Sequence, residues 1–266
     1  GGPEPGQDHP VSDQLPEAGI ELTILGSGSA FSEVGHNAGY LVDRRLLLDC
    51  GAPATSLLPA VGSSVGELEA IVISHLHGDH VLHLPTLLVA RRLRHPEAPP
   101  LRILGPRGLR DHLKRVGETA FGEGLWQRIV TEDGPLSTEV EEWTGGQSDE
   151  VAGYRLRAFT VEHSPELACL AFRLERQEVT LGYTGDTTYC PGLLQLASSV
   201  DNLLCECTSF TGPAPVHLWR GEIEQLRRDA PEASLILTHL TERQPLEGAL
   251  LAADGLTFTL RAGGQG

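Results

Sequence analysis

The chain has 266 residues, a length that suits one large domain or two small ones. Lys and Arg number 20 against 36 Asp and Glu, and the net charge of −16 opposes non-specific binding to nucleic-acid phosphates. No apolar run approaches the roughly 18 residues that span a bilayer, which excludes a membrane protein. The five cysteines are scattered without a C-x-x-C pair, a usage typical of reduced thiols, so we expect a cytoplasmic protein.

The order of apolar and polar segments predicts an α/β fold. Residues 1–19, rich in Gly, Pro and acidic side chains, predict a disordered N-terminal tail. Apolar runs predict strands over 20–25, 39–42, 45–49, 69–74, 101–104, 154–161, 167–175, 179–185, 202–206, 234–240 and 256–260. Helical periodicity predicts helices over 53–61, 84–94, 106–115, 192–198 and 219–229. Two strand-rich halves that each end in helix predict one domain over 20–262, an αββα sandwich of two mixed sheets flanked by helices.

The strongest chemical signal is the hexapeptide His75-Leu-His77-Gly-Asp79-His80 at the end of an apolar strand. Imidazole nitrogens and carboxylate oxygens are ligands that suit zinc, and also manganese or iron. In an extended turn, His75 and His77 can share one ion while Asp79 and His80 serve a second. The hexapeptide therefore predicts a metal site.

Three further side chains follow predicted strands and extend the candidate site. His163, Asp186 and His239 each stand at a strand end, where loops collect at one edge of a sandwich. With the hexapeptide they make seven candidate ligands. That number is enough for two divalent metal ions with open positions for water.

These residues, in this order, resemble the metallo-β-lactamase superfamily of metallohydrolases. Within it, the chain is most similar to the ribonuclease Z branch and its small phosphodiesterase relatives. The resemblance covers about residues 20–262 and includes LTILGSGSA with Asn37, LLLDCG, EAIVISHLHGDHVLHLPTLL, YTGDT and CECTSF.

The resemblance implies a role for each candidate residue. One zinc ion would be held by His75, His77 and His163, and the other by Asp79, His80 and His239. Asp186 would bridge the two ions, and Asp79 would also take the proton of the nucleophile. Glu206 and His217 would steer a proton to the leaving alkoxide. The alternatives are that Glu206 orients a ligand histidine and that His217 only begins a helix.

The expected reaction is hydrolysis of a phosphodiester by metal-activated water, on a small or cyclic nucleotide. His163 and Asp186 stand 23 positions apart, which leaves no room for the arm with which bacterial ribonuclease Z grips tRNA. The Pro-x-Lys-x-Arg-Asn element of that branch is reduced to Asn37. Both departures, with the acidic charge, argue against tRNA processing.

Other functions stay open at this point. A ribonuclease Z-like RNA endonuclease would use the basic stretch 91–115, with Arg91, Arg92 and Arg94 facing RNA. Thioester or lactone hydrolysis uses similar ligands on the same fold, and a metal-binding scaffold without catalysis is a further alternative. A homodimer is expected from the resemblance alone.

Several residues have two interpretations. The basic stretch 91–115 and the acidic stretch 131–150 are first interpreted as solvated surface. Cys205 and Cys207 could form a soft metal site, but core packing is preferred. Trp126, Trp143 and Trp219 could stack on a base, and packing is again preferred. His83 is interpreted as a helix-face residue.

Overall fold

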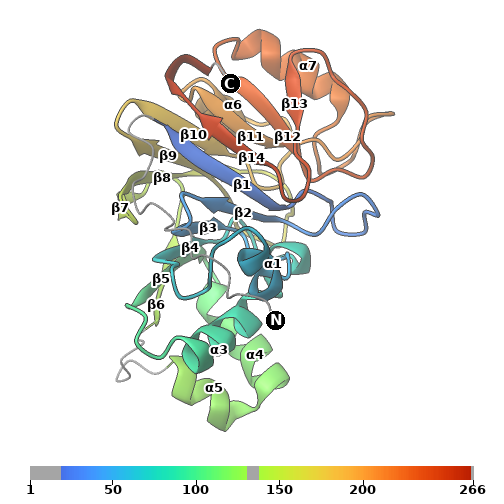
Figure 1. The fold of residues 1–266 in the computed structure, drawn as a ribbon. Coiled ribbons are helices and arrows are strands. Elements are labelled where there is room, and N and C mark those ends of the chain that lie inside the picture. The colour runs from blue at the N-terminus through green and yellow to red at the C-terminus, as the bar shows by residue number, and fades with distance from the viewer. Residues whose placement is uncertain (1–18, 131–137, 265–266) are drawn as a thin grey trace, which may run out of the picture.

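Two seven-stranded sheets lie face to face in the computed structural model, which describes residues 19–130 and 138–264 (Figure 1). Most of the tail predicted over 1–19 lies outside the described residues. The first sheet has the order β14 (Thr257–Leu260), β1 (Ile20–Gly26), β2 (Gly39–Val42), β3 (Leu46–Leu48), β4 (Ala70–Val72), β5 (Leu101–Pro106) and β6 (Thr138–Trp143). The second has the order β13 (Ala249–Leu251), β12 (Ser234–Thr238), β11 (Asn202–Glu206), β10 (Val179–Tyr183), β9 (Cys169–Arg176), β8 (Tyr154–Val161) and β7 (Ser148–Val151).

Each sheet is antiparallel in one half and parallel in the other. In the first sheet β3 to β6 are parallel, and in the second β10 to β13 are parallel. Parallel strands end at the same edge, so the loops after β4, β10, β11 and β12 can meet. This topology brings together chain segments that are far apart in sequence.

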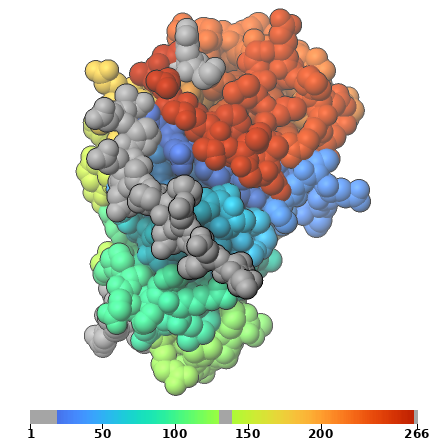
Figure 2. All heavy atoms as spheres, in the orientation of Figure 1, coloured from blue at the N-terminus to red at the C-terminus, as the bar shows by residue number. Residues whose placement is uncertain are grey.

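Helices cover the outer face of both sheets. They are α1 (Ala54–Ala60), α2 (Gly78–Val81), α3 (Leu84–Arg94), α4 (Leu109–Phe121), α5 (Glu123–Val130), α6 (Pro191–Ala197) and α7 (Arg220–Asp229), followed by a 3-10 turn at Ala262–Gly264. Figure 2 shows the segment of α3 to α5 at one end of the molecule and the C-terminal segment at the other. None of the helices in the described ranges is long and apolar enough to cross a bilayer.

Three apolar clusters hold these layers together. The largest lies between the sheets and includes Tyr40, Tyr154 and Phe172. A second cluster packs the first sheet against α1, α3 and α4, and a third packs the second sheet against α6 and α7. The layers are helix, sheet, sheet, helix, which confirms the predicted αββα sandwich.

The predicted strands match the observed ones within a few residues, but several elements were not predicted. These are β6, β7, β13, α2 and α5. The strands β6 and β7 carry acidic side chains in TEVEEW and SDEV, a composition unfavourable for strands. Arg102 on β5 compensates this charge through ion pairs with Glu141 and Asp149, each at 2.8 Å. Tertiary pairing therefore overrides local propensity here.

Candidate metal centre

The seven predicted ligands converge at the edge where the parallel strands end. His75, His77, Asp79 and His80 lie in the loop after β4 and in α2, while His163 follows β8. Asp186 follows β10 and His239 follows β12. Their donor atoms form two groups, each with all its donor atoms within 4.8 Å of one another: His75, His77 and His163, and Asp79, His80, Asp186 and His239.

The first group is built around Nδ1 of His77. This atom lies 3.1 Å from Nε2 of His75 and 2.9 Å from Nε2 of His163. His75 and His163 are buried, and His77 is half-buried. Three imidazole nitrogens that converge in this way form a typical donor set for a divalent metal ion.

The second group is built around two carboxylates. Oδ2 of Asp79 lies 3.2 Å from Nε2 of His239 and 3.3 Å from Nε2 of His80. Asp186 stands between both groups, since its carboxylate oxygens lie 3.3 Å from Nε2 of His80 and 3.7 Å from Nε2 of His75. Asp186 therefore contacts both donor groups.

Hydrogen bonds fix the tautomer of four histidines. The Nδ1 partners are Asp49 Oδ2 for His80 (2.6 Å), Val216 O for His163 (2.7 Å), Thr208 Oγ1 for His239 (2.8 Å) and Ser74 Oγ for His75 (3.0 Å). A carboxylate and a carbonyl can only accept, and both hydroxyls donate elsewhere, to Asp49 and Glu206. Each Nδ1 therefore carries the proton, and each Nε2 presents its lone pair to the centre.

Two buried polar atoms support metal binding directly. Nε2 of His80 and Oδ1 of Asp186 have no hydrogen-bond partner among the described residues. Burying such atoms without a partner is costly, and both point to where the other donors converge. The residues present fit divalent metal ions.

Electrostatics keeps the two carboxylates ionised, which is the form that a metal ligand needs. Burial alone would raise the pKa of Asp186, but His239, His80 and His75 outweigh it and hold the pKa well below its usual range. For Asp79, burial also acts to raise the pKa, but the close imidazoles of His239 and His80 outweigh burial and lower it. Burial lowers the pKa of His75.

Asp49 is a positioning residue that the sequence prediction missed. It is buried at the end of β3 with a φ of 54°, and it accepts hydrogen bonds from the Ser74 backbone N–H and hydroxyl, both at 2.7 Å. Its Oδ2 also accepts from the hydroxyl of Tyr183 and from His80. A signal was present in the sequence: Asp49 directly follows the apolar run LLL in LLLDCG, just as the histidines follow the apolar run of β4.

Asp49→Asn is expected to weaken metal binding by about 10- to 100-fold. The neutral amide accepts a weaker hydrogen bond from Nδ1 of His80 than the carboxylate does, so the ring is held less firmly. Metal affinity measured by chelator competition checks this. Asp201→Asn is the control, because the carboxylate of Asp201 accepts a hydrogen bond from the Thr180 hydroxyl and from no histidine. An unchanged affinity in the Asp49 variant would contradict the positioning role.

Gly51 positions the metal loop by having no side chain. A Cβ at Gly51 would lie 1.6 Å from the backbone oxygen of Asp79 and 3.0 Å from the nitrogen of His80. Gly51→Ala must therefore displace the segment that carries Asp79 and His80. Because a shift of about 1 Å in such groups costs about 10²-fold in rate, we expect a loss of activity of that size. Gly212→Ala, whose Cβ would meet nothing within 4 Å, is expected to keep full activity. Equal turnover by both variants would refute this close-packing argument.

Glu206 and His217 form a network beside the centre. The buried carboxylate of Glu206 accepts from the Thr187 N–H at 2.7 Å, from the Thr208 hydroxyl at 2.7 Å and from Nδ1 of His217 at 3.1 Å. Burial alone would lower the pKa of His217, but Glu206 outweighs burial and raises it. Nδ1 of His217 lies 3.7 Å from Oδ2 of Asp186, and its ring is half-buried.

Other sequence candidates lie outside the centre. Cys205 and Cys207 are buried among apolar side chains, which confirms core packing, and Trp126 and Trp143 are buried too. Trp219 instead precedes α7, where its backbone N–H donates to the Glu222 carboxylate. His83 lies at the start of α3 and contacts Thr55.

The RNA-facing role expected for Arg91 is wrong. Its side chain is only 3% exposed, and it donates to the backbone oxygens of Val65 and Pro99. Two more arginines of this stretch donate hydrogen bonds to β6: Arg102 to the carboxylate of Glu141, and Arg110 to the backbone oxygen of Val140. The stretch 91–115 therefore contributes to packing and is not wholly solvated surface.

The sandwich and its clustered histidines and carboxylates define a metallohydrolase of the metallo-β-lactamase fold, in the ribonuclease Z branch. A family profile described as "Anti-Pycsar protein Apyc1" matches residues 20–254. The chain belongs to this family.

Known proteins agree with this assignment. The chain is 30% identical over 243 residues to a ribonuclease Z of Mycolicibacterium gilvum, covering 83% of this chain and 84% of that relative. Human tRNase Z, short form, has a TM-score of 0.72 at 23% identity, covering 90% of this chain and 98% of that one. The metallo-β-lactamase fold protein YhfI from Bacillus subtilis has a TM-score of 0.73 at 20% identity, covering 91% and 100%. These two structures show the shared fold.

Proposed function

We propose that the chain is a metal-dependent phosphodiesterase that hydrolyses a small or cyclic nucleotide. The observation that carries the proposal is the bridging place of Asp186 between two donor groups, beside a buried carboxylate–histidine pair. Relatives named ribonuclease Z support cleavage of a phosphodiester bond. The Glu206–His217 pair favours this over thioester or lactone opening, because an alkoxide leaving group needs a proton.

In this proposal the centre holds two divalent ions, with zinc preferred. His75, His77 and His163 would hold one ion, Asp79, His80 and His239 the other, and Asp186 both. When bound, such ions lower the pKa of water and neutralise charge on the phosphate. Asp79 would also take the proton that the attacking water loses.

His217 is the group proposed to protonate the leaving oxygen. Its Nδ1 donates to Glu206, so its Nε2 is the atom that carries the transferable proton. Glu206 makes three hydrogen bonds within the protein and is 1% exposed, which favours a positioning role for it. Glu206 keeps His217 protonated, and His217 would deliver the proton.

Glu206→Gln is expected to move the alkaline limb of the pH–rate profile to lower pH. The charge of Glu206 raises the pKa of His217, so His217 stays protonated to higher pH in the wild type and loses activity as pH rises through that pKa. Without this charge the pKa falls, and activity is lost earlier on the alkaline side. A pH profile of kcat checks this, with metal content measured in both proteins. An unmoved alkaline limb at equal metal content would contradict the pairing.

A small substrate is supported by how His163 and Asp186 are connected. The chain between them is the hairpin β9–β10, which turns at Gln177 and Glu178. No arm for gripping a folded RNA is inserted there. An RNA substrate is the second candidate, because of the relatives named ribonuclease Z.

The experiment is a substrate panel with zinc- or manganese-loaded protein: cyclic nucleotides, a precursor tRNA, a thioester and a lactone, each at about 50 and 200 mM salt. We expect turnover of a cyclic nucleotide with little dependence on salt. Cleavage of the precursor tRNA alone, falling steeply with salt, would establish the RNA candidate instead. Turnover of only the thioester or lactone would overturn the phosphodiesterase proposal. Arg92→Ala with Arg94→Ala would weaken only the RNA reaction.

A further inference from the structure

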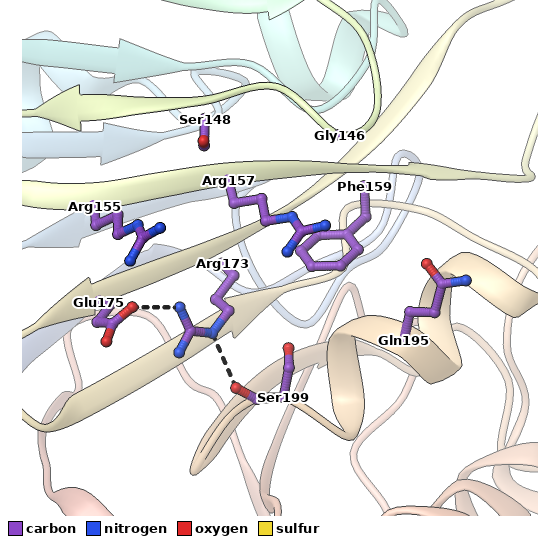
Figure 3. Close-up of a pocket in the computed structure, with 9 residues that line it drawn as sticks. All are labelled: Gly146, Ser148, Arg155, Arg157, Phe159, Arg173, Glu175, Gln195 and Ser199. Atoms are coloured by element: carbon purple, nitrogen blue, oxygen red, sulfur yellow. Dashed lines mark hydrogen bonds and ion pairs between the residues drawn. The ribbon is translucent and has the colours of Figure 1, made fainter.

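A groove of about 560 Å³ lies on the outer face of the second sheet, apart from the metal centre (Figure 3). It runs over β7, β8 and β9 and is bordered by α6. Six side chains matter here: Ser148, Arg155, Arg157, Phe159, Arg173 and Gln195. Its volume falls within the roughly 300–1,000 Å³ of sites for small molecules.

Positive charge is concentrated in the groove although the whole chain carries −16. Arg157 on β8 lies directly opposite Arg173 on β9. Like charges at directly opposite positions destabilise a sheet. Arg157 faces Ser148 on its other side, so neither neighbouring strand gives it an acidic partner.

Arg155 differs from Arg157 in having an acidic residue at the opposite position of both neighbouring strands. It lies opposite Glu175 on β9 and opposite Glu150 on β7. Within the described ranges, no carboxylate lies within ion-pair distance of Arg157 or of Arg155. Arg173 is paired with Glu175 at 2.6 Å. The unpaired charges of the groove are therefore those of Arg155 and Arg157, and Arg157 lies directly beside Arg173.

Both central guanidinium groups are held in place. Arg173 donates from Nη1 to Glu175 at 2.6 Å and from Nε to the backbone oxygen of Ser199 at 2.9 Å. The guanidinium of Arg157 lies over the ring of Phe159, 5.2 Å from its centroid. Figure 3 shows both groups in the same hollow, with Gln195 across from them on α6. A positioned pair of guanidinium groups suits the oxygens of a phosphate.

We propose that this groove binds a phosphomonoester, with its phosphate between Arg157 and Arg173. Its dianion would relieve the repulsion between the two arginines, and Ser148 and Gln195 offer hydrogen bonds to the rest of the ligand. A small ligand fits better than an RNA strand, because acidic residues interrupt the positive surface. Glu150 and Glu175 flank Arg155, and Glu162 lines the continuation of the groove along β8.

Arginine footprinting with phenylglyoxal tests the proposal on the metal-loaded protein, with inorganic phosphate and adenosine 5′-monophosphate as separate probes. Modification of each arginine is quantified by mass spectrometry, so binding of either probe at the metal centre does not interfere. We expect adenosine 5′-monophosphate to protect Arg157 and Arg173 and to leave Arg94 unprotected. Protection by inorganic phosphate at the same concentration would identify the phosphate group alone as the ligand, within the proposal.

Variants provide the second readout. Arg157→Gln and Arg173→Gln are each expected to weaken the protection of the remaining arginine about tenfold or more, whereas Arg94→Gln leaves it unchanged. Arg157→Gln removes a like charge, so its melting temperature is expected to equal or exceed that of the wild type. Equal modification of Arg157 with and without both probes would overturn the proposal. Protection by a single-stranded RNA alone would overturn it too, in favour of an RNA path.

Discussion

Asp186→Asn is expected to lower kcat/KM for an activated phosphodiester by about 10³-fold or more. Oδ1 of Asp186 lies 3.3 Å from Nε2 of His80 in the second donor group, and its Oδ2 lies 3.7 Å from Nε2 of His75 in the first. The amide of Asn has the same shape but only one oxygen and no negative charge, so it cannot ligate two cations. Metal content, measured by mass spectrometry, is expected to fall together with activity.

Asp229→Asn is the matched control for this substitution. Asp229 lies at the end of α7, where it accepts hydrogen bonds from Tyr189 and Gln225, neither of which is a proposed ligand. It is expected to keep full activity and metal content. If Asp186→Asn also kept both, a bridging role for Asp186 would be wrong.

The second large effect is expected for His217→Ala, and it depends on the leaving group. A general acid contributes about 10²- to 10⁴-fold when the leaving oxygen is a poor one, such as the ribose alkoxide of a cyclic nucleotide. A nitrophenolate leaves without a proton, so its release is expected to slow by less than about tenfold. Comparing kcat for both substrates with one variant gives the test its own control.

Equal losses on both substrates would contradict the proton-donor role of His217. That result would instead indicate that His217 positions the centre, through Asp186 at 3.7 Å or through Glu206. Retained metal content in the His217 variant is needed for either conclusion, since the ring of His217 also packs against that of His163 at 4.7 Å.

The fold and the clustering of the candidate ligands could be predicted because both leave local signals in the sequence. Buried strands appear as short apolar runs, and all seven ligand candidates stand in or after such runs. Asp43 and Arg44 form the turn between β2 and β3 with positive φ angles of 45° and 63°, as a tight hairpin requires.

What the sequence did not show depends on contacts between distant segments. The importance of Asp49 follows from His80 and Tyr183, which lie 31 and 134 positions away. The acidic strands β6 and β7 are accounted for by Arg102, which pairs with Glu141 and Asp149. The sequence placed Arg91 in a basic surface stretch, but its side chain is buried and donates to the backbone oxygens of Val65 and Pro99.

The most direct test of the central claim is hydrolysis of a cyclic nucleotide by one preparation in three states: as loaded with zinc or manganese, after removal of metal by a chelator, and after reloading. We expect turnover in the loaded state, loss on chelation, and recovery when about two ions are bound per chain. Turnover that survives chelation, or a protein that binds two ions and cleaves no phosphodiester, would contradict it.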